Sequence, residues 1–262
     1  MVGEFLEKGW LVFPAEQEVA DWSVIARKAA MERVADAAER AKWLQCEGTW
    51  FVGVDTLRND PTGAVARATP LSGAAYAAAR GMYGTLPLHR GQVSVIYPGY
   101  PRPRTGENDA GFRYRRNRDA AHVDGILAVG PDRRRMLHER HAYILGLPLN
   151  ETSADASPLV VWQGSHLIMR EMFETLLRDI PEADWASTDM TGVYQATRRR
   201  VFETCPRVTV AARPGEAYLV HRMTLHGVAP WGTGATAPDE GRMIAYFRPE
   251  LPAGDDAWLS LP

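Results

Sequence analysis

The feature that most constrains the fold of this chain is a series of short apolar segments between residues 91 and 249, rich in β-branched and aromatic residues. Gly, Pro and Asn separate the segments, and these residues are typical of turns and strand ends. The segments are "GQVSVIYP" (91–98), "HAYILGLPLN" (141–150), "SPLVVWQG" (157–164), "RVTVAAR" (207–213), "EAYLVHRM" (216–223) and "RMIAYFRP" (242–249). Many short strands with turn signals predict a β-sandwich or barrel core.

Helices are expected mainly outside this core. Residues 15–47 contain neither Gly nor Pro, and their apolar residues recur near helical spacing, which predicts one long amphipathic helix after a short strand at 8–14. A second helix is predicted at 72–82 with Ser72 as its cap, and a third from Ser165 to the stop at Pro181. We expect long polar loops at 99–121 and 182–204. The chain shows no internal boundary, so residues 1–262 are predicted to form a single domain.

Composition excludes several classes of partner. The net charge of −2 gives no general attraction to nucleic acid or to an anionic membrane, and no apolar run approaches the roughly 20 residues of a membrane span. The N-terminal stretch does not resemble a signal peptide. The two cysteines lie far apart without metal-type spacing, so we expect free thiols and a cytoplasmic location. A small molecule is the expected partner; the oligomeric state cannot be inferred.

A histidine and an aspartate two residues apart are the strongest chemical signal. On a strand, His122 and Asp124 point to the same face, although a turn holding two polar side chains is the alternative interpretation. A second imidazole would complete a two-histidine, one-carboxylate triad, which leaves three positions on Fe(II) for a co-substrate and O2. His221 and His226 are the available residues, and their odd spacing would point them to opposite faces of one strand. Gly227, next to His226, allows close backbone approach.

An arginine follows at the start of the last predicted strand. The guanidinium of Arg242 could pair bidentately with a carboxylate of the co-substrate. Arg248 lies six residues further on and would face the same side, so the spacing alone leaves both arginines open, with Arg242 preferred.

Taken together, the order of motifs resembles the phytanoyl-CoA dioxygenase group of Fe(II)/2-oxoglutarate-dependent oxygenases. The resemblance rests on His122-x-Asp124, "PLVVWQGSH", "PGEAYLVHRMTLHGVAP" and "GRMIAYFRP", with "FLEKGWLVFP" near the start. It implies a mainly β (α+β) fold, a double-stranded β-helix (jelly-roll, cupin-like) core with flanking helices. It also implies Fe(II) held by His122, Asp124 and His226, with the distal carboxylate of 2-oxoglutarate anchored by Arg242. By the same resemblance, Gln92 and Tyr97 are candidate co-substrate contacts, each with a buried structural role as its alternative.

The expected function is hydroxylation of a small organic molecule by O2, with decarboxylation of 2-oxoglutarate to succinate. A carboxylate at position 124 argues against a halogenase, which has a small residue there. Two alternatives remain: a cupin-type metal-dependent isomerase or hydrolase without 2-oxoglutarate, which has no need of Arg242, and a non-enzymatic ligand-binding jelly roll. The arginines between 102 and 118 and at 133–135 are either a solvated face or a rim that favours an anionic substrate.

Overall fold

The computed structural model describes residues 1–254 and 257–262. Its strands are β1 (Trp10–Phe13), β2 (Leu44–Gln45), β3 (Trp50–Phe51), β4 (Gln92–Ile96), β5 (Ile126–Val129), β6 (Arg134–Leu137), β7 (Tyr143–Pro148), β8 (Leu159–Trp162), β9 (Arg207–Val210), β10 (Ala217–His221), β11 (His226–Val228) and β12 (Arg242–Phe247). Its helices are α1 (Val2–Lys8), α2 (Gln17–Ala35), α3 (Ala37–Trp43), α4 (Ala74–Tyr83), α5 (Asp109–Asn117), α6 (Ser165–Leu177), the 3₁₀ helix η1 (Glu182–Ser187), α7 (Thr191–Thr204) and α8 (Ala257–Ser260). In this part of the chain, no helix is both long and apolar enough to cross a membrane.

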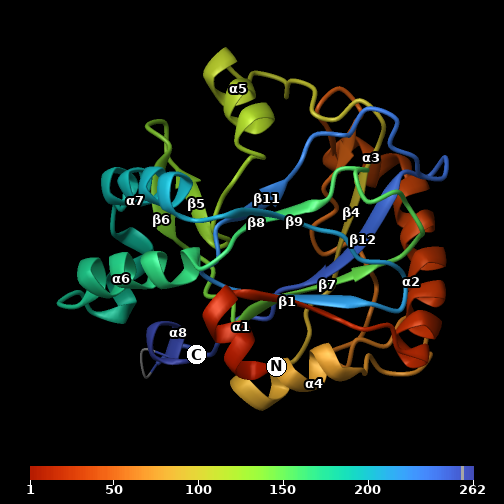
Figure 1. The fold of residues 1–262 in the computed structure, drawn as a ribbon, viewed down its shortest axis with the longest axis horizontal. Helices are drawn as coiled ribbons and strands as arrows, with labels where there is room; N and C mark the ends of the chain where they lie inside the picture. The colour runs from red at the N-terminus through yellow and green to blue at the C-terminus, as the bar shows by residue number, and fades with distance from the viewer. Residues whose placement is uncertain (255–256) are drawn as a thin grey trace.

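The strands form two antiparallel sheets that face each other (Figure 1). One has the order β1-β10-β7-β12-β4-β3-β2, the other has the order β11-β8-β9, and β5 and β6 form a separate hairpin. After β7 the chain passes to β8 and β9 of the smaller sheet, returns at β10, leaves at β11 and returns again at β12. The sheets enclose one apolar cluster, made of Ile144, Leu159, Val161, Val210, Tyr218, Val220 and Ile244. This confirms the expected mainly β core with flanking helices, and the strands pair antiparallel.

The outer face of the large sheet is covered by α2. Trp22 packs edge-on against Phe247 of β12 with ring centroids 5.9 Å apart, and its indole N–H donates to the carbonyl of Gly63. The prediction of one continuous helix over 15–47 is wrong, because the chain breaks at Asp36. The Asp36 carboxylate accepts from the backbone N–H groups of Ala38 and Glu39, which starts α3.

The start of α4 also differs from the expectation. Its cap is Gly73 rather than Ser72, and the helix begins where the carboxylate of Glu16 accepts from the N–H of Ala74 at 2.7 Å. A residue 58 positions away therefore supplies the anion at this helix N-terminus, which local sequence could not indicate.

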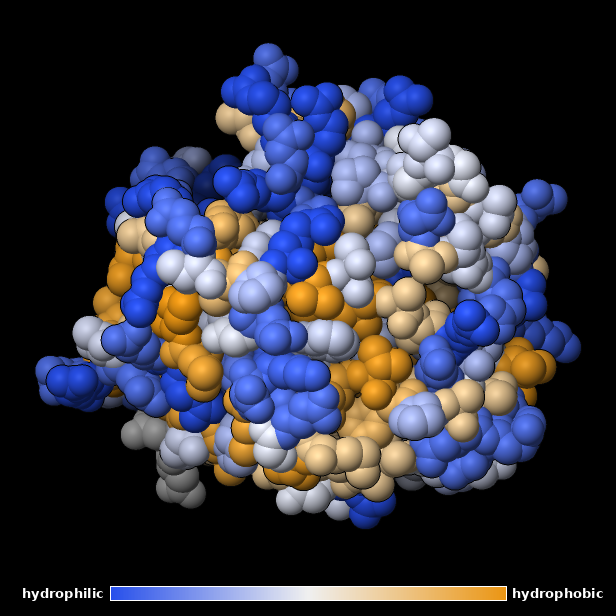
Figure 2. All heavy atoms as spheres, in the orientation of Figure 1, coloured by the Kyte–Doolittle hydropathy of each residue, from blue (hydrophilic) through white to orange (hydrophobic). Residues whose placement is uncertain are grey.

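The segments predicted as long loops contain helices, so that prediction is wrong. Asn108 caps α5 through the N–H of Gly111, and Figure 2 shows hydrophilic residues over this helix at the top of the view. In α7, Tyr194 and Val201 are the buried residues, so the helix has too narrow an apolar stripe to stand out in the sequence. In Figure 1, α6 and α7 lie at the left, opposite α2.

Candidate metal centre

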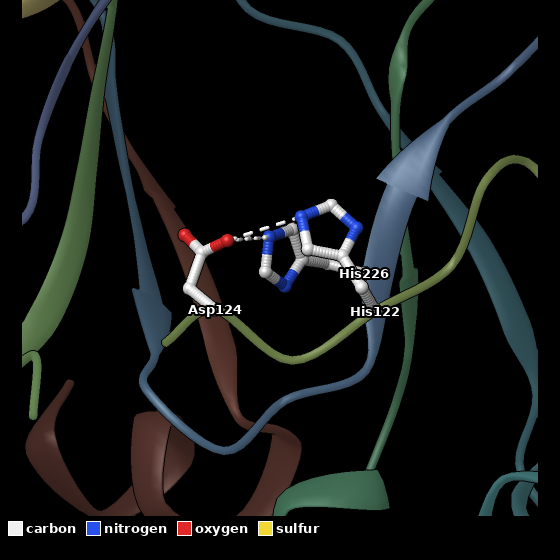
Figure 3. A group of neighbouring side chains, drawn as sticks. All are labelled: His122, Asp124 and His226. Atoms are coloured by element: carbon white, nitrogen blue, oxygen red, sulfur yellow. Dashed lines mark ion pairs between the residues drawn. The ribbon is translucent and has the colours of Figure 1, made fainter. Parts of the chain in front are cut away.

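The three residues of the expected triad come together from two segments of the chain. His122 forms an isolated β-bridge between α5 and β5, Asp124 lies in the turn that leads into β5, and His226 is the first residue of β11. The backbones of His122 and His226 bond reciprocally, N–H to carbonyl, at 2.8 and 3.0 Å. This antiparallel bridge places the two imidazole rings with centroids 4.7 Å apart, and Asp124 faces both of them (Figure 3).

One oxygen of Asp124 points between the two rings. Its Oδ1 atom lies 3.0 Å from Nε2 of His122 and 3.7 Å from Nε2 of His226. One potential ligand atom from each of the three residues lies within 4.8 Å of the other two. Both Nδ1 atoms are engaged elsewhere: His122 donates to the carbonyl of Ala120 at 3.0 Å, and His226 to that of Thr224 at 2.9 Å. These bonds select the tautomer that leaves Nε2 free to bind a metal.

The centre is closed on one side and open on the other. Side chains of Asp124 and His226 are 8% and 9% exposed, whereas that of His122 is 48% exposed.

Burial lowers the pKa of His226 to about 4, with the Asp124 charge opposing the shift. Burial also disfavours ionised Asp124, but Arg248, His226 and His122 together hold the pKa of its carboxyl well below the usual range. Near neutral pH the site therefore presents a carboxylate and a neutral buried imidazole, the forms that bind metals.

Arg248 holds the other oxygen of Asp124. Its Nη1 lies 3.2 Å from Oδ2 of Asp124, and its Nη2 donates to Oε1 of Gln92 at 2.7 Å. The backbone of Arg248 is fixed as well, because its N–H donates to Nε2 of His89 and its carbonyl accepts from Nδ1 of His141. From the sequence, Arg248 was only the alternative to Arg242 as anchor of the co-substrate carboxylate. No local signal indicated its contact with Asp124.

Arg242 lies at the other end of β12. It shares a face with Ile244, so its side chain points toward the space between the sheets, where it is 6% exposed. Nη1 of Arg242 is buried and has no hydrogen-bond partner among residues 1–254 and 257–262. Burial and the Tyr246 hydroxyl raise the pKa of Tyr218 well above its usual value, and nearby Arg242 opposes the rise.

The two candidate co-substrate contacts, Gln92 of β4 and Tyr97 directly after this strand, lie apart from each other. Gln92 reaches the site through Arg248, but Tyr97 is an odd number of residues away and belongs to the opposite face of the strand. Tyr97 lines an outer cavity with Met31, Val34 and Arg40, among others. The structure therefore does not bring Tyr97 together with the triad.

His221 is also remote from the triad. It ends β10, whereas His226 begins β11, so the two do not share one strand as the spacing argument assumed. Its ring lies 4.8 Å from that of His166, centroid to centroid, and its Nδ1 accepts from the N–H of Met223. Both histidines are buried and hold backbone segments.

The donor set fits a divalent first-row metal with open positions. Two imidazole nitrogens and one carboxylate oxygen suit Fe(II) in a facial arrangement, which leaves room for further ligands on the side where His122 is exposed. A structural zinc site would more often have four protein ligands.

Comparisons with known proteins agree with this fold. No protein-family model matches the chain, and no curated protein matches it. Among solved structures, the non-heme alpha-ketoglutarate-dependent carbocyclase SnoK from nogalamycin biosynthesis superposes with a TM-score of 0.52 at 17% identity, covering 94% of this chain and 82% of that chain. AviO1 from Streptomyces viridochromogenes Tue57 has a TM-score of 0.52 at 15% identity, with coverages of 97% and 95%. At such identities the likeness establishes a shared fold.

Proposed function

We propose that this protein is an Fe(II)/2-oxoglutarate-dependent oxygenase that hydroxylates a small organic molecule. The observation that carries the proposal is the convergence of His122, Asp124 and His226, whose potential ligand atoms lie within 4.8 Å of one another. The alternation of the chain between two facing sheets supports a jelly-roll core in a single domain. When bound, Fe(II) with 2-oxoglutarate and O2 would supply the oxidising chemistry that forms succinate, CO2 and a hydroxylated product.

Arg242 is proposed to anchor 2-oxoglutarate. A buried guanidinium without a partner for Nη1 among the described residues is costly, and a carboxylate would satisfy it. Arg248 is already engaged by Asp124 and Gln92, which favours Arg242 for this role. A cupin-type isomerase or hydrolase without 2-oxoglutarate would leave this buried charge unexplained.

Other residues of the chain orient the ligands of the centre. The carbonyls of Ala120 and Thr224 fix the two imidazoles, and Arg248 fixes the carboxylate, so each ligand atom is held before a metal binds.

Cys46 and Cys205 are free thiols, which supports the proposed cytoplasmic location.

The test is succinate formation. Purified protein is incubated in air with Fe(II), ascorbate and 2-oxoglutarate, first alone and then with pools of candidate substrates, and succinate is measured. We expect succinate from the wild-type protein and from Arg199→Gln, a control at an exposed position of α7, and none above background from His226→Ala or Arg242→Gln. If the wild-type protein forms no succinate but binds Fe(II) stoichiometrically, the result would instead favour a metalloenzyme that does not use 2-oxoglutarate.

A further inference from the structure

A cluster of arginine and tyrosine side chains lies where α5, β6 and α7 meet. The guanidinium of Arg198 on α7 lies over the rings of Tyr114 and Tyr194, at 5.0 and 4.8 Å from their centroids. Its Nη1 donates to the hydroxyl of Tyr114 at 2.8 Å. Arg135 of β6 lies beside the start of α7, where its backbone N–H donates to Oγ1 of Thr191 at 2.8 Å, and its charge acts on Tyr114 and Tyr194.

The cluster adjoins the segment that carries His122 and Asp124. The hydroxyl of Tyr194 accepts from the N–H of Val123, the residue between them, at 2.9 Å. The hydroxyl of Tyr114 donates to the carbonyl of Ala121 at 2.8 Å, and Nη1 of Arg198 lies 3.4 Å from the same oxygen. Arg198 is therefore held against the backbone of the metal-binding segment, together with the two tyrosines.

The positive charge of this cluster is uncompensated in the part of the chain that the structure describes. There Arg135 and Arg198 form no ion pair with an acidic side chain, and Nε of Arg198 is buried without a partner. Other arginines of this region differ: Arg115 pairs with Glu107, and Arg207 holds Asp119 with two bonds of 2.8 Å.

The lack of an acidic partner is significant because both arginines are partly buried. Arg135 is half-buried, and desolvation, with the charges of Arg198 and Arg133, lowers its pKa from the usual value. Like-charged guanidinium groups in a partly desolvated place repel each other, and an anion between them would relieve both costs. Because neither arginine is fully buried, such an anion can reach them from solvent.

We propose that Arg135 and Arg198 form an oxyanion subsite that holds the acidic group of the substrate beside the metal centre. The substrate is then a small organic acid, with a carboxylate or a phosphate as the group recognised. This inference rests on the proposed function, since it takes the triad as the place where the substrate reacts. Two planar guanidinium groups suit both anions, because each can donate two parallel N–H bonds.

The test measures anion binding without iron, 2-oxoglutarate or turnover. Metal-free protein is titrated with inorganic phosphate and, separately, with propionate, and binding is followed by the rise in thermal unfolding temperature and by calorimetry at constant ionic strength. Arg135→Gln is the principal variant, because its side chain makes no hydrogen bond within the described residues and its loss should leave the fold intact. Arg198→Gln is the second, and Arg199→Gln is the matched control on the same helix.

We expect at least one anion to bind wild-type protein and Arg199→Gln equally, and to bind Arg135→Gln and Arg198→Gln about tenfold more weakly. Tighter binding of phosphate indicates a phosphorylated substrate, and tighter binding of propionate indicates a carboxylic acid. Equal binding of both anions to wild-type protein and Arg135→Gln, or no binding to either, overturns the subsite. Because no succinate is measured, a failure here is distinct from a failure of the proposed oxygenase activity.

Discussion

Nη1 of Arg248 lies 3.2 Å from Oδ2 of Asp124, while Oδ1 of the same carboxylate faces His122 and His226. The two oxygens of Asp124 therefore have separate partners. This division favours a carboxylate that offers a single oxygen to the metal, and it keeps the carboxylate ionised in a buried place.

Replacing Arg248 should weaken metal binding without removing a ligand. We expect Arg248→Met to raise the Kd for Co(II) about tenfold to a hundredfold, because residues that orient metal ligands typically have this effect. Arg248→Lys should restore part of the affinity, since it keeps the charge but loses the two-pronged contact with Asp124 and Gln92. Optical titration with Co(II) measures both, and Arg90→Met, at an exposed position, is the control. Unchanged affinity in Arg248→Met would show that the contact does not position Asp124.

The same pair should be energetically coupled in the metal-free protein. Asp124→Ala leaves the guanidinium of Arg248, whose side chain is 16% exposed, without its carboxylate, so we expect a loss of about 2 kcal/mol in the free energy of unfolding. The double variant Asp124→Ala/Arg248→Met should cost less than the sum of the two single changes. Urea denaturation of all four proteins gives the coupling, and strict additivity would argue against it.

Gly227 should be essential for bringing the ligands together. A Cβ atom at this position would overlap the backbone carbonyl of Asp119 and press on the N–H of Ala121, in the segment that leads to His122. We expect Gly227→Ala to destabilise the protein by about 3 kcal/mol and to weaken metal binding, because β11 must move away from that segment. Gly192→Ala, on α7 with no atom near its Cβ, is the control. Wild-type stability and metal affinity in Gly227→Ala would contradict this geometry.

Stability should fall in mild acid because two neighbouring histidines are buried uncharged. Burial, followed by the charges of Arg222, His166 and Arg170, lowers the pKa of His221 well below its usual value, and burial with Arg170 and Arg222 lowers that of His166. The unfolded chain binds these protons first, so the stabilisation is complete above pH of about 6.5 and is lost as pH falls below it.

Urea denaturation between pH 8 and pH 5 should therefore show a smaller loss of stability in His221→Gln than in wild-type protein. His138→Gln, at an exposed position, should keep the wild-type dependence. An identical pH dependence in all three proteins would mean that His221 does not carry this effect.

Strands were predictable where local pattern and tertiary structure agree. β4, β7, β8, β9, β10 and β12 each lie inside a segment recognised by its β-branched residues and its turn punctuation. The β5–β6 hairpin escaped notice because its second strand, Arg134–Leu137, begins with two arginines and has a single buried residue. The break at Asp36 had a local signal, an Asp followed three residues later by Glu39, that the absence of Gly and Pro obscured.

The spacing of His122 and Asp124 indicated a metal site because residues two apart on an extended chain share a face. Identifying His226 as the third ligand depended on the resemblance to a jelly-roll family. The bridge between His122 and His226 joins residues 104 positions apart, and no local sequence pattern encodes it. The contact of Arg248 with Asp124 depends on which end of β12 meets the triad. The position of the half-buried Tyr97, on the wrong face for the site, depends on the phase of the strand before it.

The proposed 2-oxoglutarate-dependent iron centre is tested most sharply by an anaerobic titration with Fe(II) followed by 2-oxoglutarate, observed by visible absorption. We expect one Fe(II) per chain and a weak charge-transfer band that appears only after 2-oxoglutarate is added. His226→Ala should lack the band because it loses Fe(II), whereas Arg242→Gln should bind Fe(II) but need far more 2-oxoglutarate. Stoichiometric Fe(II) binding with no band at any concentration of 2-oxoglutarate in the wild-type protein would contradict the proposal.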